Sequence, residues 1–349
     1  MSGKGEDNMR MFRTVYMRGG TSKGCMFLKE DLPEREQWDD IFLQVMGNPD
    51  PKQIDGMGGT VSSNNKIVVM GRSNRSGIDA DYLVGQVIVG KKQVDYASNC
   101  GNMTAAAAAY ALQREATADG HVYIGQNWDN RPYLLPHTLL LHITEEETGN
   151  IIFGLTEAGQ LIRNGFNNKG VGQCANSLRA TLDKQGSGVP STFVRRQLLR
   201  LDNMDDMVKL IRTASRSVSV NYCLASCENK VGDVEAVPGQ PVLFSPVDGI
   251  ITHANHLLVN RDLDTSSVRR FRGERLYELF SAEKGNITRE YIRKCLCDHE
   301  GHPQGVCSHV SPEGKVWQTN ASMIYDLDER KAWVCYGPPC EGEYKEYML

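Results

Sequence analysis

The chain has 349 residues, with 39 Lys+Arg against 43 Asp+Glu and a formal net charge of −4. Its 40% hydrophobic and 23% charged residues lie near globular averages, which excludes a disordered, collagenous or coiled-coil chain. No apolar run reaches the roughly 18–20 residues that span a bilayer. The near-neutral balance without basic runs argues against nucleic acid as a partner. The length suits two ordinary domains or one large one.

The N-terminal segment and the cysteines bear on the compartment. Residues 1–10 are polar and lack the apolar stretch of a secretory signal, so we interpret them as a disordered tail. Without an export signal, most of the ten cysteines are expected to be reduced thiols that pack as small hydrophobes. We therefore assign the protein to the cytoplasm by default.

The first third of the chain alternates short strand patterns with glycine-rich turns. Strands are predicted at residues 11–17, 25–28, 67–70 and 82–89. Helical spacing of apolar residues predicts a helix over 34–46, and 104–112 is a run of small helix formers. Glycine-rich loops are predicted at 18–24 and 55–60.

Cys100 lies in a predicted tight turn just before the second of these helices. The first backbone N–H groups of a helix lack partners, so such a cysteine sits in positive partial charge. This environment lowers a thiol pKa and can also bind an anionic group. For the tetrapeptide Asn99-Cys100-Gly101-Asn102 alone, the alternative is a glycine-assisted turn with an N-cap and no chemical role.

Three segments act together as a signature: Met17–Gly24, Asp55–Gly59 with its continuation to Lys66, and Ser98–Asn102. In this order they resemble the 2-methylaconitate cis-trans isomerase (PrpF) family, which has the diaminopimelate-epimerase-like fold. The resemblance implies that Lys66 and Cys100 move a proton next to a carboxylate of a small polycarboxylic acid. It further implies that the substrate carboxylates are held by Ser22, Asn64 and Asn65.

The implied chemistry is physically consistent. Removing such a proton leaves an enolate-like charge, which needs donors where the charge develops. Backbone N–H groups of Gly101 and Asn102 at the helix start would supply them. Lys66 needs a depressed pKa to act as the base, with Cys100 returning the proton. For Lys66 alone, the alternative is an exposed lysine at the start of a strand.

The resemblance ends near Gln113. A second, pseudo-repeated domain that would close the cleft has no counterpart in the sequence. Residues 11–113 are therefore expected to be a partial half-domain, and the join to the following segment lacks a Pro/Ser/Gly linker.

From Glu115 onward a different set of motifs follows: Ala116–Gly120, Gly125–Asp129, Gly165–Gly172, Thr252–His256, Gly305–His309, Ala321–Asp326 and Gly337–Glu341. Together they resemble the isopenicillin N acyltransferase family of N-terminal-nucleophile enzymes, which implies an αββα sandwich over 115–349. Strand patterns at 138–144 and 151–155 agree, as do helical segments near 190–215 and 265–298. The fold class expected for the whole chain is α+β.

The catalytic residue of that family is a cysteine freed by self-cleavage, whose new α-amino group serves as its base. It should lie shortly upstream of Ala116, but residues 105–114 contain no Cys, Ser or Thr. Asp129 and Asn255 remain as orienting and oxyanion residues of an acyltransferase-like remnant. Ser308 stands where the family often has Arg.

One further constellation resembles a zinc-binding pattern: Cys295, Cys297, His299, His302, Cys307 and His309. Cys307 and His309 already have an explanation in the acyltransferase resemblance. Cys295 and Cys297 point to different helix faces if that helix extends. We therefore expect no metal, and no cofactor.

Three functions follow from these patterns. The favoured one is an isomerase of aconitate- or methylaconitate-type acids acting through Lys66 and Cys100, because acyl transfer fails outright without a nucleophile. The alternative is an acyl-CoA-dependent amide acyltransferase or amidohydrolase of secondary metabolism, inactive for want of its cysteine. The third is a non-functional fusion, either natural or the product of an incorrect gene model. The expected partner is a small carboxylic acid, with no nucleic acid or membrane, and no feature specifies the oligomeric state.

Overall fold

The structure is a computed structural model that describes residues 10–73, 75, 80–97, 100–103, 116–184, 188–266, 271–312 and 316–349. The expected tail lies outside these residues except for Arg10, as does the expected helix over 104–112. The chain divides into two compact units, Met1–Gln113 and Arg114–Leu349. Each combines helices with β-sheet, which confirms the expected α+β class.

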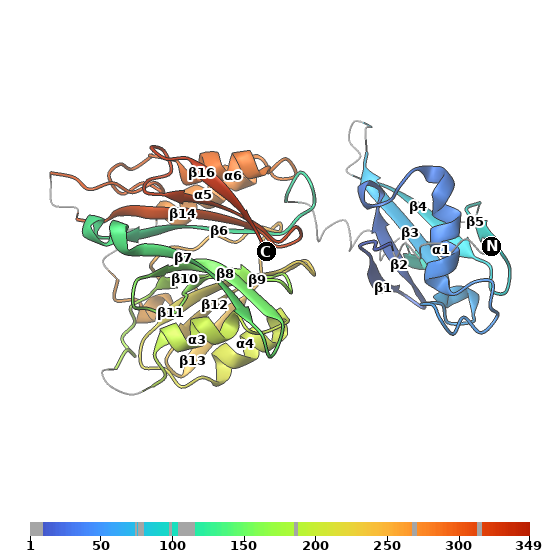
Figure 1. Ribbon diagram of the computed structural model, residues 1–349, viewed down its shortest axis with the longest axis horizontal. Helices are drawn as coiled ribbons and strands as arrows, with labels where there is room; N and C mark the ends of the chain where they lie inside the picture. The colour runs from blue at the N-terminus through green and yellow to red at the C-terminus, as the bar shows by residue number, and fades with distance from the viewer. Residues whose placement is uncertain are drawn as a thin grey trace, which may run out of the picture. The chain divides into compact units, whose positions relative to one another are not determined.

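The first unit is built on one five-stranded sheet in the order β1-β2-β3-β4-β5 (Figure 1). The strands are β1 (Val15–Gly19), β2 (Ser22–Leu28), β3 (Lys66–Arg72), β4 (Ala80–Val87) and β5 (Val94–Asp95). Between β2 and β3 lie η1 (Lys29–Asp31), η2 (Arg35–Gln37), α1 (Trp38–Met46) and η3 (Ser62–Asn64). β2 and β3 are parallel, and the other neighbouring strands are antiparallel.

Both faces of this sheet are buried. Alternation along β2 sends Phe27 toward α1, where its ring centroid lies 5.4 Å from that of Phe42. Met26 points to the opposite face, where it packs with Met103. The helix α1 ends at Gly47, which adopts the left-handed conformation with φ 76°.

The expected loop over 18–24 is wrong in its extent, because this segment forms a tight β-hairpin. β1 runs to Gly19 and β2 begins at Ser22, so the turn is only Gly20 and Thr21. Gly20 has φ 54°, which a glycine adopts without steric cost. The strand expected at 11–17 begins only at Val15. The hairpin places Ser22, a predicted site residue, at the start of a strand.

The second unit contains two antiparallel sheets. The seven-stranded sheet has the order β13-β12-β11-β10-β9-β8-β7, and the four-stranded sheet has the order β16-β15-β14-β6. The strands of the first are β7 (Thr138–Glu145), β8 (Asn150–Glu157), β9 (Asn164–Asn167), β10 (Val171–Ser177), β11 (Val220–Ser226), β12 (Lys230–Val237) and β13 (Gln240–Phe244). Those of the second are β6 (Tyr123–Asn130), β14 (Gln318–Asp326), β15 (Lys331–Tyr336) and β16 (Tyr344–Met348).

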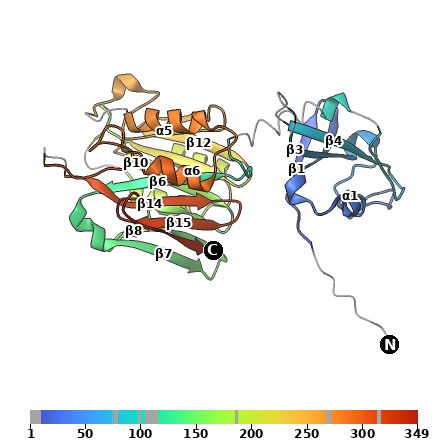
Figure 2. The ribbon, with the colours of Figure 1, turned by 90° about the horizontal axis from the view of Figure 1, so that it is seen from above.

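Helices cover the outer face of each sheet, so this unit has four layers (Figures 1 and 2). α3 (Ser191–Leu198) and α4 (Met204–Thr213) pack on the seven-stranded sheet. α5 (Phe271–Ala282) and α6 (Arg289–Leu296) pack on the four-stranded sheet. Short helices η4 (Pro132–His137) and η5 (Arg261–Leu263) lie in connections.

The central core lies between the two sheets. Phe166 of the seven-stranded sheet and Tyr325 of the four-stranded sheet meet with ring centroids 5.2 Å apart. The expected strands at 138–144 and 151–155 are confirmed as β7 and β8. Among the described helices, none combines the length and apolar character needed to cross a bilayer.

Candidate functional site

The Cys100 side chain lies next to the β1–β2 hairpin. It immediately precedes the helical residues 101–103, and its Sγ lies 3.8 Å from Oγ of Ser22. Asn102 donates from Nδ2 to the hydroxyl oxygens of Thr21 at 2.9 Å and Ser22 at 3.4 Å. A Cβ on Gly20 would lie 2.4 Å from Oδ1 of Asn102, so only glycine lets the turn and the helix start approach this closely.

The surroundings of Cys100 favour its thiolate. Burial raises the pKa of the Cys100 thiol. Hydrogen bonds from the backbone N–H of Met103 and the hydroxyl of Ser22 lower this pKa, as do the charge of Lys66 and the backbone N–H of Asn102. The net result is a pKa below the ordinary thiol value. This is the direction expected for a cysteine at a helix start.

Lys66 is the first residue of β3 and is held by the neighbouring strands. Its Nζ donates to Oε1 of Gln86 on β4. The Gln86 amide in turn donates to the carbonyl oxygens of Asn65 and Val87, each at 3.0 Å. A Cβ on Gly24 of β2 would lie 2.3 Å from the Lys66 carbonyl oxygen. A glycine there lets β2 and β3 pair at the level of Lys66.

The two predicted asparagines lie in and next to η3. Asn65 is fully buried, accepts from Nε2 of Gln53 and donates to the Val61 carbonyl at 2.9 Å. Its amide therefore organises the glycine-rich loop. Asn64 lies against Gly59, where a Cβ would be 2.6 Å from its Nδ2. A direct role of either asparagine in holding a carboxylate stays a prediction.

In the second unit, Arg272 of α5 joins the two residues of the acyltransferase-like remnant. Its guanidinium donates from Nη1 to Asp129 Oδ2, and from Nη2 to Asn255 Oδ1 at 2.9 Å. Asp129 also accepts from the Thr319 hydroxyl at 2.8 Å, and Asn255 donates to the Ser177 carbonyl at 3.1 Å. Asp129 and Asn255 are 126 residues apart in sequence, yet one side chain contacts both.

Sequence reasoning did not find Arg272. No local motif contains it, and only packing of α5 on the four-stranded sheet brings it to the end of β6. The group consists of one cation, one carboxylate and one amide, and the cation donates to both of the others. Residues 104–115, where the nucleophile of an N-terminal-nucleophile enzyme would stand, lie outside the described residues.

Comparison with known families confirms both sequence resemblances. Residues 9–120 match the model of the PrpF protein family. Residues 116–341, more than half of the chain, match the model of acyl-coenzyme A:6-aminopenicillanic acid acyl-transferase.

Two curated relatives match a short part of the chain. Over 105 residues it is 52% identical to 2-methyl-aconitate isomerase of Shewanella oneidensis, covering 28% of this chain and 26% of that protein. Over 105 residues it is 48% identical to 4-oxalomesaconate tautomerase of Pseudomonas putida, covering 30% of this chain and 29% of that protein. The chain thus spans between a quarter and a third of the length of these relatives.

Among solved structures, the chain is similar to penicillin V acylase from Agrobacterium tumefaciens. The match has 9% sequence identity, covers 64% of this chain and 81% of that chain, and has a TM-score of 0.45.

Proposed function

Since the chain belongs, through residues 116–341, to the acyl-coenzyme A:6-aminopenicillanic acid acyl-transferase family but has no Cys, Ser or Thr over 105–114, we propose that its chemistry resides in the PrpF-like unit. The proposed reaction is movement of a proton and a double bond in a small polycarboxylic acid of the aconitate or methylaconitate type. Its relatives are named for isomerisation of methyl-aconitate and tautomerisation of oxalomesaconate.

The observation that supports this proposal is the environment of Cys100. Its lowered pKa increases the population of the thiolate, the form that can accept a proton, so we assign Cys100 as the base and Lys66 as the acid. This reverses the roles expected from the sequence. The Nζ of Lys66 already acts as a donor, toward Gln86.

The proposed steps conserve protons and electrons. The Cys100 thiolate takes a proton from the carbon next to a carboxylate, and the electron pair moves into that carboxylate as an enolate-like charge. The Ser22 hydroxyl and the backbone N–H groups of Gly101 and Asn102 stabilise this charge. The Lys66 ammonium then protonates the far carbon of the allylic system, which shifts the double bond. Solvent returns the proton from Cys100 to Lys66.

The test is an exchange experiment with the full chain. Purified protein is incubated in D2O with trans-aconitate or methylaconitate, and the proton signals next to the carboxylates are followed by NMR. We expect deuterium incorporation together with isomerisation, because base and acid exchange with solvent between turnovers. Heat-denatured protein is the control. Rates equal to those of the control with every acid tested would rule out the isomerase.

A second function is supported by the contact of Arg272 with Asp129 and Asn255. We propose that the second unit binds an amide or carboxylate ligand without cleaving it, because the upstream segment supplies no nucleophile.

Intact-mass spectrometry tests the non-cleaving assignment. We expect one unprocessed chain of 38.8 kDa, since self-cleavage needs a nucleophilic side chain at the cleavage point. Two fragments with a break between residues 100 and 116 would instead show that the unit processes itself, which would contradict the non-cleaving assignment.

A further inference from the structure

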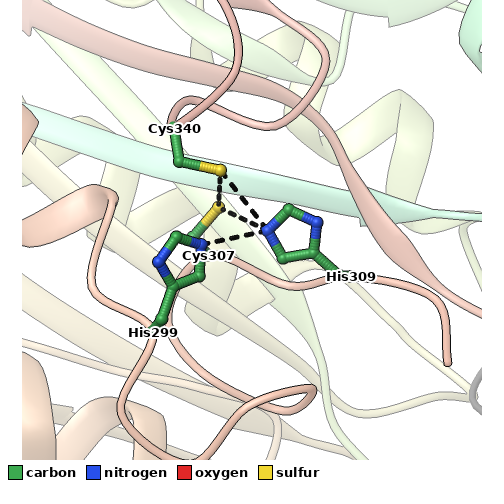
Figure 3. A group of neighbouring side chains, drawn as sticks. All are labelled: His299, Cys307, His309 and Cys340. Atoms are coloured by element: carbon green, nitrogen blue, oxygen red, sulfur yellow. Dashed lines mark hydrogen bonds between the residues drawn. The ribbon is translucent and has the colours of Figure 1, made fainter.

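Four side chains with metal-binding atoms converge beside the four-stranded sheet (Figure 3). They are His299, Cys307 and His309, from the loop that follows α6, and Cys340, from the connection between β15 and β16. Their Nε2 and Sγ atoms all lie within 4.8 Å of one another. Cys340 is 31 residues from His309 in sequence, so no local spacing pattern includes it.

Four of the six separations among these atoms lie close to the edges of a zinc tetrahedron. Zinc bonds of 2.3 Å to sulfur and 2.0–2.1 Å to nitrogen imply edges of about 3.8 Å for S···S, 3.6 Å for N···S and 3.3 Å for N···N. The structure has 3.5 Å between the two sulfurs and 3.0 Å between the two imidazole Nε2 atoms. His309 Nε2 lies 3.4 Å from each sulfur. Each of these four edges is shorter than the zinc edge by about 0.2–0.3 Å, and the two from His299 to the sulfurs are within 4.8 Å.

The loop that carries three of the four residues is fixed independently of any metal. The Asn127 amide of β6 donates to the carbonyls of Leu296 at 2.8 Å and Val306 at 2.9 Å. The backbone N–H of Cys307 donates to the Asp298 carbonyl at 2.9 Å. A Cβ on Gly305 would lie 3.0 Å from the Glu300 carbonyl oxygen, so glycine permits this close turn. The ligand geometry is therefore preorganised by the fold.

Outer contacts also suit a metal site. The other ring nitrogen of His309, Nδ1, lies 3.6 Å from a carboxylate oxygen of Glu341. This separation is longer than a hydrogen bond, so Glu341 acts on the imidazole as a nearby negative charge. The backbone N–H of Cys340 also hydrogen-bonds to the Cys307 sulfur, so the two segments are joined at this point.

We propose that His299, Cys307, His309 and Cys340 bind one Zn²⁺ ion in a tetrahedral site. Two thiolates and two imidazoles form a zinc ligand set, and four protein ligands leave no open position for substrate. The site is therefore structural: it ties the loop after α6 to the connection between β15 and β16. This proposal replaces our expectation of no metal and is independent of the proposed isomerase.

The sequence pattern shares His299, Cys307 and His309 with this group but contains Cys295 and Cys297 in place of Cys340. Cys295 is buried near the end of α6, and Cys297 is the residue that caps this helix. Both fall outside the four-residue group. Cys297 and His302 therefore serve as matched controls from the same loop.

The test uses the full chain, kept reduced and stripped with a chelator, and then titrated with Zn²⁺ or Co²⁺. We expect one equivalent of zinc per chain and, with cobalt, thiolate-to-metal charge-transfer absorption with tetrahedral d–d bands. Cys340→Ser and His299→Ala should each weaken zinc binding by at least about tenfold. Cys297→Ser and His302→Asn should bind zinc as the wild type does. Far-UV circular dichroism checks that each variant is folded.

Three outcomes would overturn the proposal. The first is a wild-type chain that shows no thiolate-to-cobalt absorption. The second is zinc affinity that Cys340→Ser leaves unchanged. The third is recovery of a Cys307–Cys340 disulfide, without metal, from freshly purified protein. The two sulfurs are 3.5 Å apart, whereas a disulfide requires about 2.05 Å.

Discussion

Cys100→Ser is expected to slow isomerisation by a factor of roughly 10²–10⁴, the usual contribution of a positioned acid or base. A serine hydroxyl does not ionise near neutral pH, so the variant has no base at this position. The hydrogen bonds of Asn102 to Thr21 and Ser22 do not involve the sulfur and should persist. The measurement is kcat for the acid identified in the D2O experiment. A residual rate within a few-fold of wild type would remove Cys100 from the mechanism.

The charge of Lys66 gives this prediction a pH dependence. That charge is one of the causes that lower the Cys100 pKa, so Lys66→Gln should raise the thiol pKa. The thiolate then forms only at higher pH, and the acid limb of the kcat/KM profile should shift upward. The rate of Cys100 alkylation by iodoacetamide reports the same shift without any substrate.

Lys23→Gln is the matched control, because Lys23 is an exposed lysine of the same strand as Ser22. Lys23→Gln should leave the pH dependence of Cys100 alkylation unchanged. Equal shifts in the two lysine variants would mean that general surface charge, and not the position of Lys66, controls the thiol.

The largest effects on stability are expected at two carboxylates buried on one face of β12. Asp233 and Glu235 are both fully buried. Burial raises the pKa of Glu235, but hydrogen bonds from His253 and from the backbone N–H groups of Leu258 and Val259 lower it below its ordinary value. For Asp233, burial dominates and raises the pKa to about 7. One strand thus carries two carboxyl groups whose pKa values are shifted in opposite directions.

Their amide variants should therefore act in opposite directions at pH 8. Glu235→Gln breaks a buried pair with His253, at 3.1 Å, and should cost about 3–5 kcal/mol of unfolding free energy. Asp233 binds its proton more tightly when folded, so wild-type stability falls as pH rises from about 4 to about 7. The difference between 3.8 and about 7 corresponds to roughly 4 kcal/mol at pH 8. Asp233→Asn should restore much of this lost unfolding free energy at pH 8 and little of it at pH 4.

Hydrogen exchange of the β12 amides in urea measures these effects in the second unit alone. His253 contributes a pH dependence of its own. Burial lowers the His253 pKa, but Glu235 and Asp233 raise it by more, so the net pKa lies above the ordinary value. The stability that the charged His253 contributes is therefore also lost as pH rises through its folded-state pKa. Glu228→Gln, at a carboxylate side chain 58% exposed after β11, is the control and should change little. The prediction fails if Asp233→Asn destabilises more at pH 8 than at pH 4.

Elements with strong periodicity could be predicted from the sequence. The apolar runs of β7 and β8 and the apolar spacing of α1 with its glycine stop identify these elements, because such patterns depend only on residues that are neighbours along the chain. The β1–β2 hairpin was missed, since a glycine-rich stretch is equally compatible with a loop. The two families could also be identified from the sequence, because the resemblance to each is carried by short local motifs.

The sequence by itself determined that this chain joins two unlike families, that Cys100 precedes a predicted helix, and that residues 105–114 contain no Cys, Ser or Thr. These properties depend on neighbours along the chain. Only the tertiary structure decided that Arg272 contacts Asp129 and Asn255, and that Cys340 completes a group with His299, Cys307 and His309. The same holds for the burial that raises the pKa of Asp233 to about 7. Those depend on burial and on contacts between distant segments, which no local pattern records.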